Sequence, residues 1–217
     1  MGVYINPFTD FGFKRIFGEE DNKDLLIDFL NELLLPQGIT IGDLTYKPTA
    51  RLPLSAEDRK VVFDLHCTNQ RGDRFTVELQ KAKQTHFKDR MLYYSSFTIQ
   101  EQGKQGPWDY RLDAVYMIAI LEFMFDKAAA AQKVVGYHQI SDVETHAPFT
   151  DKLTYITIEI PRFTKTEAEL ETNLDRWLYL LKHLHEFERV PAALQTRIMQ
   201  KVFRIAEYTK LSKEAKQ

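Results

Sequence analysis

The sequence of 217 residues predicts a mixed α/β fold with a helical C-terminal tail. Segments with apolar residues every three to four positions alternate with segments of period two, and one long run is almost wholly apolar. The predicted elements follow the order α-β-β-β-α-β-β-β-α-α, which is typical of a sheet flanked by helices. The chain length and the hydrophobic fraction of 44% suffice for one large domain, or for one domain with a small appendage.

The first α of this order stands for a helical segment of two helices. One ends near Gly18, and a second spans residues 23–35, where apolar residues recur at helical spacing until Pro36 terminates it. From residue 39 the period changes to that of strands. Strands are predicted over residues 39–46, 61–68, 74–80, 113–125, 133–140 and 152–160, and further helices over residues 84–102, 165–187 and 192–210. The continuous apolar character of residues 113–125 indicates a central strand buried on both faces.

Composition and charge exclude several classes of protein. Acidic and basic residues number 31 and 29, so the net charge of −2 does not indicate a nucleic-acid binder, and any such role rests on local patches. The single cysteine, Cys67, excludes an internal disulfide and a cysteine-based zinc ribbon. No apolar run reaches the ~20 residues of a membrane helix, and Asp10, Lys14 and Arg15 interrupt any signal-peptide segment. We therefore expect a cytoplasmic protein without a membrane partner.

The strands over residues 61–68 and 74–80 form a predicted hairpin around the polar loop 69–73. If Thr68 pairs with Arg74, two acids lie directly opposite each other, Asp64 and Glu78. Side chains alternate between the two faces of a strand, so one face of the hairpin is wholly apolar and the other is mainly polar. The apolar face holds Phe63, Leu65, Cys67, Phe75, Val77 and Leu79, and the other holds Val62, Asp64, His66, Thr68, Arg74, Thr76, Glu78 and Gln80.

The opposed acids Asp64 and Glu78 need compensation, because two carboxylates facing each other across a sheet lie ~5 Å apart and repel. A hard divalent cation such as Mg²⁺ takes carboxylate oxygens and waters as ligands. It also lowers the pKa of a bound water and stabilises charge on a phosphoryl group. The spacing is also compatible with a solvated sheet face on which Arg74 or Lys81 balances the acids. Taken alone, the spacing favours the solvated face.

Several motifs form a combination that is more specific than any one of them. The hairpin supplies Val62-Phe-Asp64-Leu, then Gly72, then Val77-Glu78-Leu-Gln80. The next helix supplies Phe87-xx-Arg90-xx-Tyr93-Tyr94-Ser95, and the opening segment, residues 8–18, together with Pro161-Arg-Phe and the helix containing Trp177, completes the set. Over essentially the whole chain, this combination resembles the PD-(D/E)xK nuclease-like transposase family. That family is related to the Rpn recombination-promoting nucleases of bacteria.

The resemblance implies a restriction-endonuclease-like fold, in which helices flank a mixed β-sheet core, and a metal-dependent nuclease site. Carried over position by position, Asp64 and Glu78 match the two metal-binding acids, and Gln80 takes the place of the superfamily's usual lysine. The implied catalytic residues are these three, with Mg²⁺ or Mn²⁺ held by the two acids. Members of the family commonly carry glutamine here. A neutral amide can hydrogen-bond to an attacking water but cannot offset developing negative charge as lysine does.

Further candidates lie around this site. Candidates for contact with nucleic acid are Lys14, Arg15, Lys83, Arg90 and Tyr94. Each also has a plain structural interpretation as a surface or packing residue, and Arg90 and Tyr94, which share one helical face, are also placed to brace Glu78.

Two residues of the hairpin remain, His66 and Cys67. His66 shares the polar face with Asp64 and is interpreted as a metal ligand or, more commonly for such a residue, as a surface histidine. Cys67 belongs to the apolar face and is interpreted as an inert core residue.

The sequence thus predicts a metal-dependent DNA endonuclease in a bacterial transposase or recombination-promoting context. The predicted domains are a nuclease-like core, 1–163, and a helical C-terminal extension, 164–217, whose end resembles a helix that normally continues. DNA is the expected partner, no small-molecule organic cofactor is expected, and a homodimer is left open. The alternative is a catalytically weak or inactive relic of the fold that acts as a nucleic-acid- or protein-binding module. Gln80 and the slightly acidic net charge favour this alternative.

Overall fold

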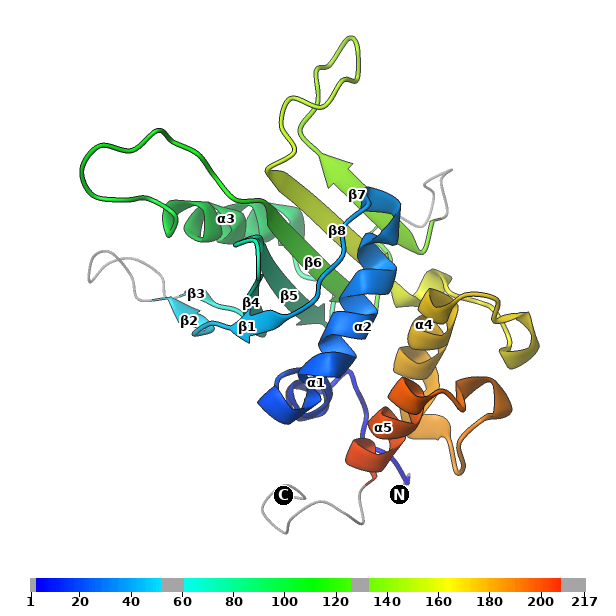
Figure 1. The fold of residues 1–217 in the computed structure, drawn as a ribbon. Coiled ribbons are helices and arrows are strands. Elements are labelled where there is room, and N and C mark those ends of the chain that lie inside the picture. The colour runs from blue at the N-terminus through cyan, green and yellow to red at the C-terminus, as the bar shows by residue number, and fades with distance from the viewer. Residues whose placement is uncertain (1–2, 52–60, 126–132, 208–217) are drawn as a thin grey trace. The chain divides into compact units, whose positions relative to one another are not determined.

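The computed structural model describes residues 3–51, 61–125 and 133–207 (Figure 1). The chain divides into two compact units, Met1–Gly42 with Phe163–Gln217, and Asp43–Arg162. We call them the helical unit and the sheet unit. None of the helices in the described ranges is both long enough and apolar enough to span a bilayer. The predicted domains, 1–163 and 164–217, stay a prediction, because contacts within a fold do not establish which segments fold on their own.

The sheet unit is built on a six-stranded sheet with the order β1-β4-β5-β6-β8-β7. Its strands are β1 (Leu44–Tyr46), β4 (Leu65–Asn69), β5 (Arg74–Gln80), β6 (Val115–Leu121), β7 (Val135–Gln139) and β8 (Leu153–Glu159). The central strands β5, β6 and β8 run parallel, and every pair that involves β1, β4 or β7 is antiparallel. The short strands β2 (Ala50–Arg51) and β3 (Val61–Val62) pair separately. The predicted mixed α/β fold is confirmed.

Helix α3 (Phe87–Gln100) connects β5 to β6 and packs on one face of the sheet (Figure 1). Its residues Phe87 and Met91 share a buried apolar cluster with alternate side chains of the parallel strands. Those side chains are Val115, Met117, Ala119 and Leu121 of β6 and Leu153 of β8. Because paired residues of neighbouring strands point to the same face, Glu78 and Gln80 of β5 also lie on this face. We call it the α3 face.

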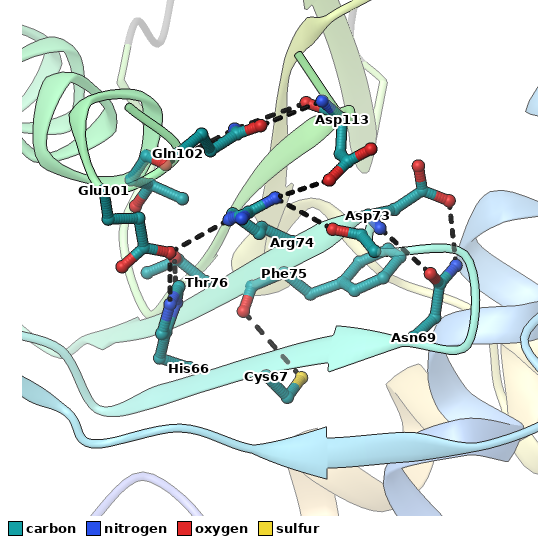
Figure 2. Close-up of polar contacts among 12 residues, drawn as sticks. His66, Cys67, Asn69, Asp73, Arg74, Phe75, Thr76, Glu101, Gln102 and Asp113 are labelled. Carbon is teal, nitrogen blue, oxygen red and sulfur yellow. Dashed lines mark hydrogen bonds and ion pairs between the residues drawn. The ribbon is translucent and has the colours of Figure 1, made fainter. Parts of the chain in front are cut away.

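Polar contacts tie the β4–β5 hairpin to the end of α3 and to the start of β6 (Figure 2). Arg74 Nε donates to Glu101 Oε1 at 3.0 Å, and Arg74 Nη1 donates to Asp113 Oδ2 at 3.1 Å. The ring of His66 lies between Glu101 Oε1 and Thr76 Oγ1, each 3.1 Å from a ring nitrogen. His66 is fully buried, so these partners satisfy its polar atoms where water does not reach. The network fixes the strand that carries Glu78.

The hairpin loop is closed by Asn69. Its Oδ1 accepts from two backbone N–H groups of the loop, at 2.9 and 3.0 Å, and its Nδ2 donates to Asp73 Oδ2 at 2.8 Å. Gly72 has a φ of 91°, a left-handed conformation that glycine adopts without steric cost. The loop delivers the predicted register, which begins with Thr68 opposite Arg74.

The helical unit contains α1 (Asp10–Phe17), α2 (Lys23–Leu34), α4 (Asn173–His183) and α5 (Arg197–Ala206). Thr9, Thr172 and Thr196 cap three of these helices, since each side chain accepts from a backbone N–H of the first turn. Short 3₁₀ helices in the described chain are η1 (Glu20–Asn22), η2 (Leu35–Gln37), η3 (Ile160–Arg162), η4 (Glu167–Glu169), η5 (Leu184–Glu186) and η6 (Ala192–Leu194).

An aromatic cluster holds α1, α2 and α4 together. The ring of Phe17 lies 5.5 Å from the rings of Phe29 and Trp177, measured between centroids. Trp177 Nε1 donates to Asp28 Oδ1 at 2.6 Å, which satisfies the buried indole N–H. The predicted first and second helices and the helix with Trp177 therefore form one core.

Some predicted bounds are wrong. Residues 39–43 are not a strand, and the predicted strand 61–68 is divided into β3 and β4 by a bend. The predicted helix 165–187 has its α-helical part only in α4, and the predicted helix 192–210 only in α5. The last ten residues, 208–217, lie outside the described residues, and so does the predicted continuation of the final helix.

We predict that Gly72→Ala destabilises the protein more than Gly106→Ala. Both glycines have a positive φ, 91° and 84°, at which an alanine costs ~1–2 kcal/mol. A Cβ on Gly72 would also lie 2.8 Å from Asp113 Oδ2 and displace it from Arg74, whereas a Cβ on Gly106 meets nothing within 4 Å. Urea unfolding should therefore show an additional loss of ~0.5–1.5 kcal/mol for Gly72→Ala. Equal losses would contradict a role for the Gly72–Asp113 contact.

Candidate functional site

Asp64 lies in the bend between β3 and β4, one residue before Leu65 begins β4. Its Oδ2 accepts from the backbone N–H of Leu79 at 2.7 Å. A carboxylate therefore takes the place of a strand carbonyl as the partner of this N–H, which is a common way for an aspartate to interrupt regular structure. The bend is how the chain brings this acid to the end of β5.

Phe63 corrects the predicted alternation. Its ring lies 5.3 Å from the ring of His66 and 5.6 Å from that of Tyr94, between centroids. His66 and the helix α3 with Tyr94 are on the α3 face, so Phe63 is on this face too and not on the apolar face with Leu65. The period of two begins only after the bend, because Asp64 leaves the ladder.

Asp64 and Glu78 are in direct contact. The backbone N–H of Asp64 donates to Glu78 Oε1 at 3.2 Å, while the Asp64 carboxylate holds the N–H of Leu79, the residue after Glu78. Each carboxylate thus accepts a hydrogen bond from the backbone in or next to the other acid, which holds the two residues side by side. The structure brings together the two acids that the sequence singled out, and their role as metal ligands stays a prediction.

Glu78 is only 6% exposed although it is an acid. Burial, and after it the neighbouring charge of Asp64, raise the pKa of Glu78 to about 8. Arg90 and the hydrogen bond from the Asp64 N–H lower the pKa of this carboxyl, but by less. Arg90 Nη2 lies 3.4 Å from Glu78 Oε2, a long contact for an ion pair. A carboxyl so displaced from its ordinary pKa is typical of functional sites.

Gln80 lies two residues after Glu78 on the α3 face, at the last position of β5. Its side chain is half-buried, and its Nε2 donates to the carbonyl of Ala82 at 3.0 Å. The amide is thus beside the acids in the strand but is held by the segment that follows. Its role as a catalytic residue stays a prediction.

Arg90 connects α3 to the acids. Its guanidinium carbon lies 4.7 Å from the centroid of the Tyr94 ring, and its Nη1 donates to Gln84 Oε1 at 2.9 Å. With the contact to Glu78, this arrangement favours the interpretation in which Arg90 braces the acid and Tyr94 supports Arg90. Contact of either residue with nucleic acid stays a prediction.

The other predicted phosphate-contacting bases have protein partners. Lys83 Nζ donates to the carbonyl of Phe125 at 2.8 Å. In the helical unit, Lys14 and Arg15 pair with acidic residues of the same segment at 2.7 and 2.6 Å. The Lys14 pair is exposed and contributes little to stability, so Lys14 can exchange its partner at small cost, whereas Arg15 is part-buried and contacts both carboxylate oxygens of Glu19.

The sequence interpretation of His66 as a surface histidine is wrong, because its side chain is fully buried. Its partner Glu101 follows 35 positions later, at the end of α3, and no local pattern indicates that contact. Sequence reasoning also missed that Arg74 joins Glu101 to Asp113. Cys67 is a buried core residue as predicted, and burial raises the pKa of its thiol to about 12.

The two acids fit a hard divalent cation. Within the described ranges, no group of three or more His, Cys, Asp and Glu side chains is placed to hold a metal ion. Mg²⁺ does not need one, since it is often held by one or two carboxylates, with waters and substrate phosphates as the other ligands. Burial and the charge of Asp64 both disfavour ionised Glu78, and a dication between the two carboxylates would offset that cost.

A family model described as PD-(D/E)XK nuclease family transposase matches residues 7–217, nearly the whole chain. The chain belongs to this family. No curated protein and no solved structure was found to match the chain. Membership of the PD-(D/E)XK family confirms the resemblance seen in the motifs and agrees with the open mixed sheet flanked by helices. It places the chain among nuclease folds, for which divalent metals are the usual cofactors and DNA is the suggested substrate.

We predict that the metal-free protein loses stability as the pH rises from about 4.5 to about 8. Glu78 has its ordinary pKa of 4.5 when the chain is unfolded and a pKa of about 8 when folded, so the folded state holds an extra proton in this window. Stability then falls by at most ~1.4 kcal/mol per pH unit. Glu78→Gln removes this titration and should flatten the fall. Denaturant unfolding in EDTA across this range measures it.

The control for this prediction is Glu144→Gln, which removes an exposed carboxylate from the β7–β8 loop. It should leave the pH dependence of unfolding as in the wild type. An identical pH dependence in Glu78→Gln and in the wild type would mean that Glu78 is not the group that titrates.

Proposed function

We propose that the chain is a metal-dependent DNA endonuclease that hydrolyses phosphodiester bonds in a transposition or recombination context. The observation that carries the proposal is the contact between Asp64 and the buried Glu78 at the end of β5. A fold keeps two acids together in a poorly hydrated place at a cost in stability. Metal binding would explain why the fold keeps this destabilising pair of acids, and family membership supports the same interpretation.

Asp64 and Glu78 are the residues that would hold Mg²⁺ or Mn²⁺. When bound, such an ion lowers the pKa of a coordinated water and offsets charge developing on a phosphate. The remaining contribution of the chain is positional. The N–H groups of Asp64 and Leu79 orient the two carboxylates, and Arg90 contacts Glu78 from α3.

Gln80 is proposed to orient the attacking water. Its Nε2 donates one N–H to the Ala82 carbonyl at 3.0 Å, which leaves a second N–H and Oε1 to hydrogen-bond to a water. A neutral amide supplies one oriented hydrogen bond and no charge, which predicts slower chemistry than a lysine would support. Lys83, which follows closely, is engaged at the Phe125 carbonyl.

A second candidate function is that of a relic which binds nucleic acid or protein without cleaving. Gln80 favours it, because the position that usually carries a lysine offers no charge and one N–H of its amide is engaged at Ala82. Cleavage and binding assays on the same variants separate the two functions.

The purified protein should nick supercoiled plasmid with Mg²⁺ or Mn²⁺ and not with EDTA. Asp64→Asn and Glu78→Ala should abolish nicking because each removes a metal-binding carboxylate. Gln80→Ala should slow it by about 10- to 1,000-fold, the effect of one oriented hydrogen bond in a transition state. Gln105→Ala changes an exposed glutamine of the loop after α3 and should nick as the wild type does.

Filter binding of the same DNA at fixed salt separates binding from chemistry, since affinity depends steeply on ionic strength. Gln80→Ala should bind normally, because a neutral amide contributes little to phosphate contacts. Nicking that persists undiminished in both acid variants would come from a contaminant and would overturn the assignment. Binding without nicking by the wild type would favour the relic.

Added Mg²⁺ or Mn²⁺ should raise the melting temperature of the wild type, because an ion that binds only the folded state stabilises it. Asp64→Asn should lose this shift. In EDTA at a pH above about 8, where Glu78 is ionised, the same variant should be more stable than the wild type by ~0.5 kcal/mol, since it removes the repulsion with Glu78 while an asparagine oxygen can still accept from Leu79. Asp151→Asn, at an exposed acid, is the control and should keep the metal-dependent shift.

A further inference from the structure

A cavity of about 660 Å³ opens on the α3 face of the sheet unit, between α3, β7 and β8. Aromatic and aliphatic side chains form much of its lining. These are Met91 and Leu92 of α3, Phe125 after β6 and Tyr155 of β8. Its volume lies in the range of about 300–1,000 Å³ that is typical of sites for small organic groups.

The cavity lies on the same face of the sheet as the candidate nuclease site. Gln80 of β5 pairs with Leu121 of β6, and Leu121 pairs with Glu159 of β8, which lines the cavity. Neighbouring strands are ~4.8 Å apart, so the wall at β8 is about 10 Å from the site at β5. Both lie at the carboxyl ends of parallel strands, the edge at which open α/β sheets bind ligands.

Cations predominate in the charged part of the lining. The one carboxylate in it, Glu159, already accepts from Arg162 Nε at 2.9 Å and from the Phe125 N–H at 3.1 Å. Lys88 and Lys133 are exposed and add two positive charges. Lys88 Nζ lies 5.3 Å from the centroid of the Phe125 ring, so one cation sits directly beside an aromatic wall. The lining therefore suits a flat apolar group that carries negative charge.

His138 adds a polar edge without adding charge. Burial, and after it the charge of Lys88, lower the pKa of His138 below its ordinary value, so the ring is neutral at neutral pH. Its Nε2 lies 3.0 Å from Thr157 Oγ1. The pair offers hydrogen-bonding groups inside an otherwise apolar and aromatic enclosure.

We propose that this cavity receives an unpaired nucleobase of the DNA strand bound at Asp64 and Glu78. The proposal rests on the proposed nuclease function. The rings of Phe125 and Tyr155 suit a base, since bases stack on aromatic side chains in proteins that bind single strands. Lys88 and Lys133 suit the adjoining phosphates, as lysines commonly do at nucleic-acid backbones.

A base within a duplex cannot enter the cavity without leaving its stack, and the cost is least for a base that is already unpaired. The distance of about 10 Å corresponds to roughly three nucleotide steps of ~3.4 Å. The accepted base therefore lies within about three nucleotides of the scissile phosphate. The expected substrates are single-stranded or mismatched DNA rather than a fully paired duplex.

The test uses the full chain in EDTA with 2-aminopurine deoxyribonucleoside 5′-monophosphate, whose fluorescence falls when its base stacks on an aromatic ring. Phe125→Ala removes an aromatic wall, and Lys88→Ala removes a cation from an exposed position. The matched controls are Tyr110→Ala and Lys104→Ala, both at exposed residues outside the lining. Phe125→Ala should weaken binding about fivefold to a hundredfold, the effect of one stacking contact, and Lys88→Ala should weaken it measurably. Neither control should weaken it.

The outcomes separate this proposal from the nuclease function because the assay needs neither metal nor cleavage. Plasmid nicking without any binding of the mononucleotide would overturn the cavity and leave the endonuclease intact. Mononucleotide binding that the cavity variants weaken, without nicking, would support the cavity and overturn the endonuclease. Binding that the cavity variants and the controls weaken equally would overturn the cavity. Displacement by inorganic phosphate as readily as by deoxyadenosine monophosphate would show a site for phosphate alone and overturn recognition of the base.

Discussion

The in-register parallel pairing of β5, β6 and β8 is the constraint on which the polar groups of the α3 face depend. Paired residues of neighbouring strands point their side chains to the same face of the sheet. The face on which a residue of β5 lies is therefore also the face of its counterpart in β8. Between them, β6 offers only apolar side chains to this face and packs against Phe87 and Met91. The polar side chains of β5 on this face form two groups, Arg74 and Thr76 near the hairpin loop and Glu78 and Gln80 at the carboxyl end.

These two ends differ in how their charges are compensated. Near the loop, Arg74 faces Glu101 and Asp113, and the buried His66 completes a network in which each ionised group has a partner of opposite charge or a hydrogen bond. Such a fully satisfied network makes a rigid anchor. At the carboxyl end, Glu78 is buried beside another acid, and a long contact to Arg90 and one hydrogen bond from the Asp64 N–H compensate it incompletely. Local costs of this kind persist where a fold has been kept for function rather than for stability.

The loop and the apolar alternation suffice to predict how β4 pairs with β5, because a period of two leaves few registers that bury one whole face. The bend at Asp64 is not predictable in this way, since the alternation of residue types continues through Phe63. A carboxylate that captures a backbone N–H across the hairpin breaks it. The burial of His66 depends in the same way on Glu101, and the cavity depends on the position of β7 beyond β8. The metal-binding role predicted for Asp64 and Glu78 came from the motif combination, because the spacing of the two acids alone favours a solvated face.

The two units differ in how the chain is distributed between them. The sheet unit is the continuous segment Asp43–Arg162, whereas the helical unit takes residues from both sides of it. During synthesis the whole sheet unit therefore emerges from the ribosome before α4 and α5 do, and domains generally fold as units in that order. The aromatic cluster of Phe17 and Phe29 is complete only after Trp177 has been synthesised. If the sheet unit folds first, the two parts of the helical unit are joined by a compact body rather than by an unfolded segment of the same length. The order of translation would then favour assembly of the helical core.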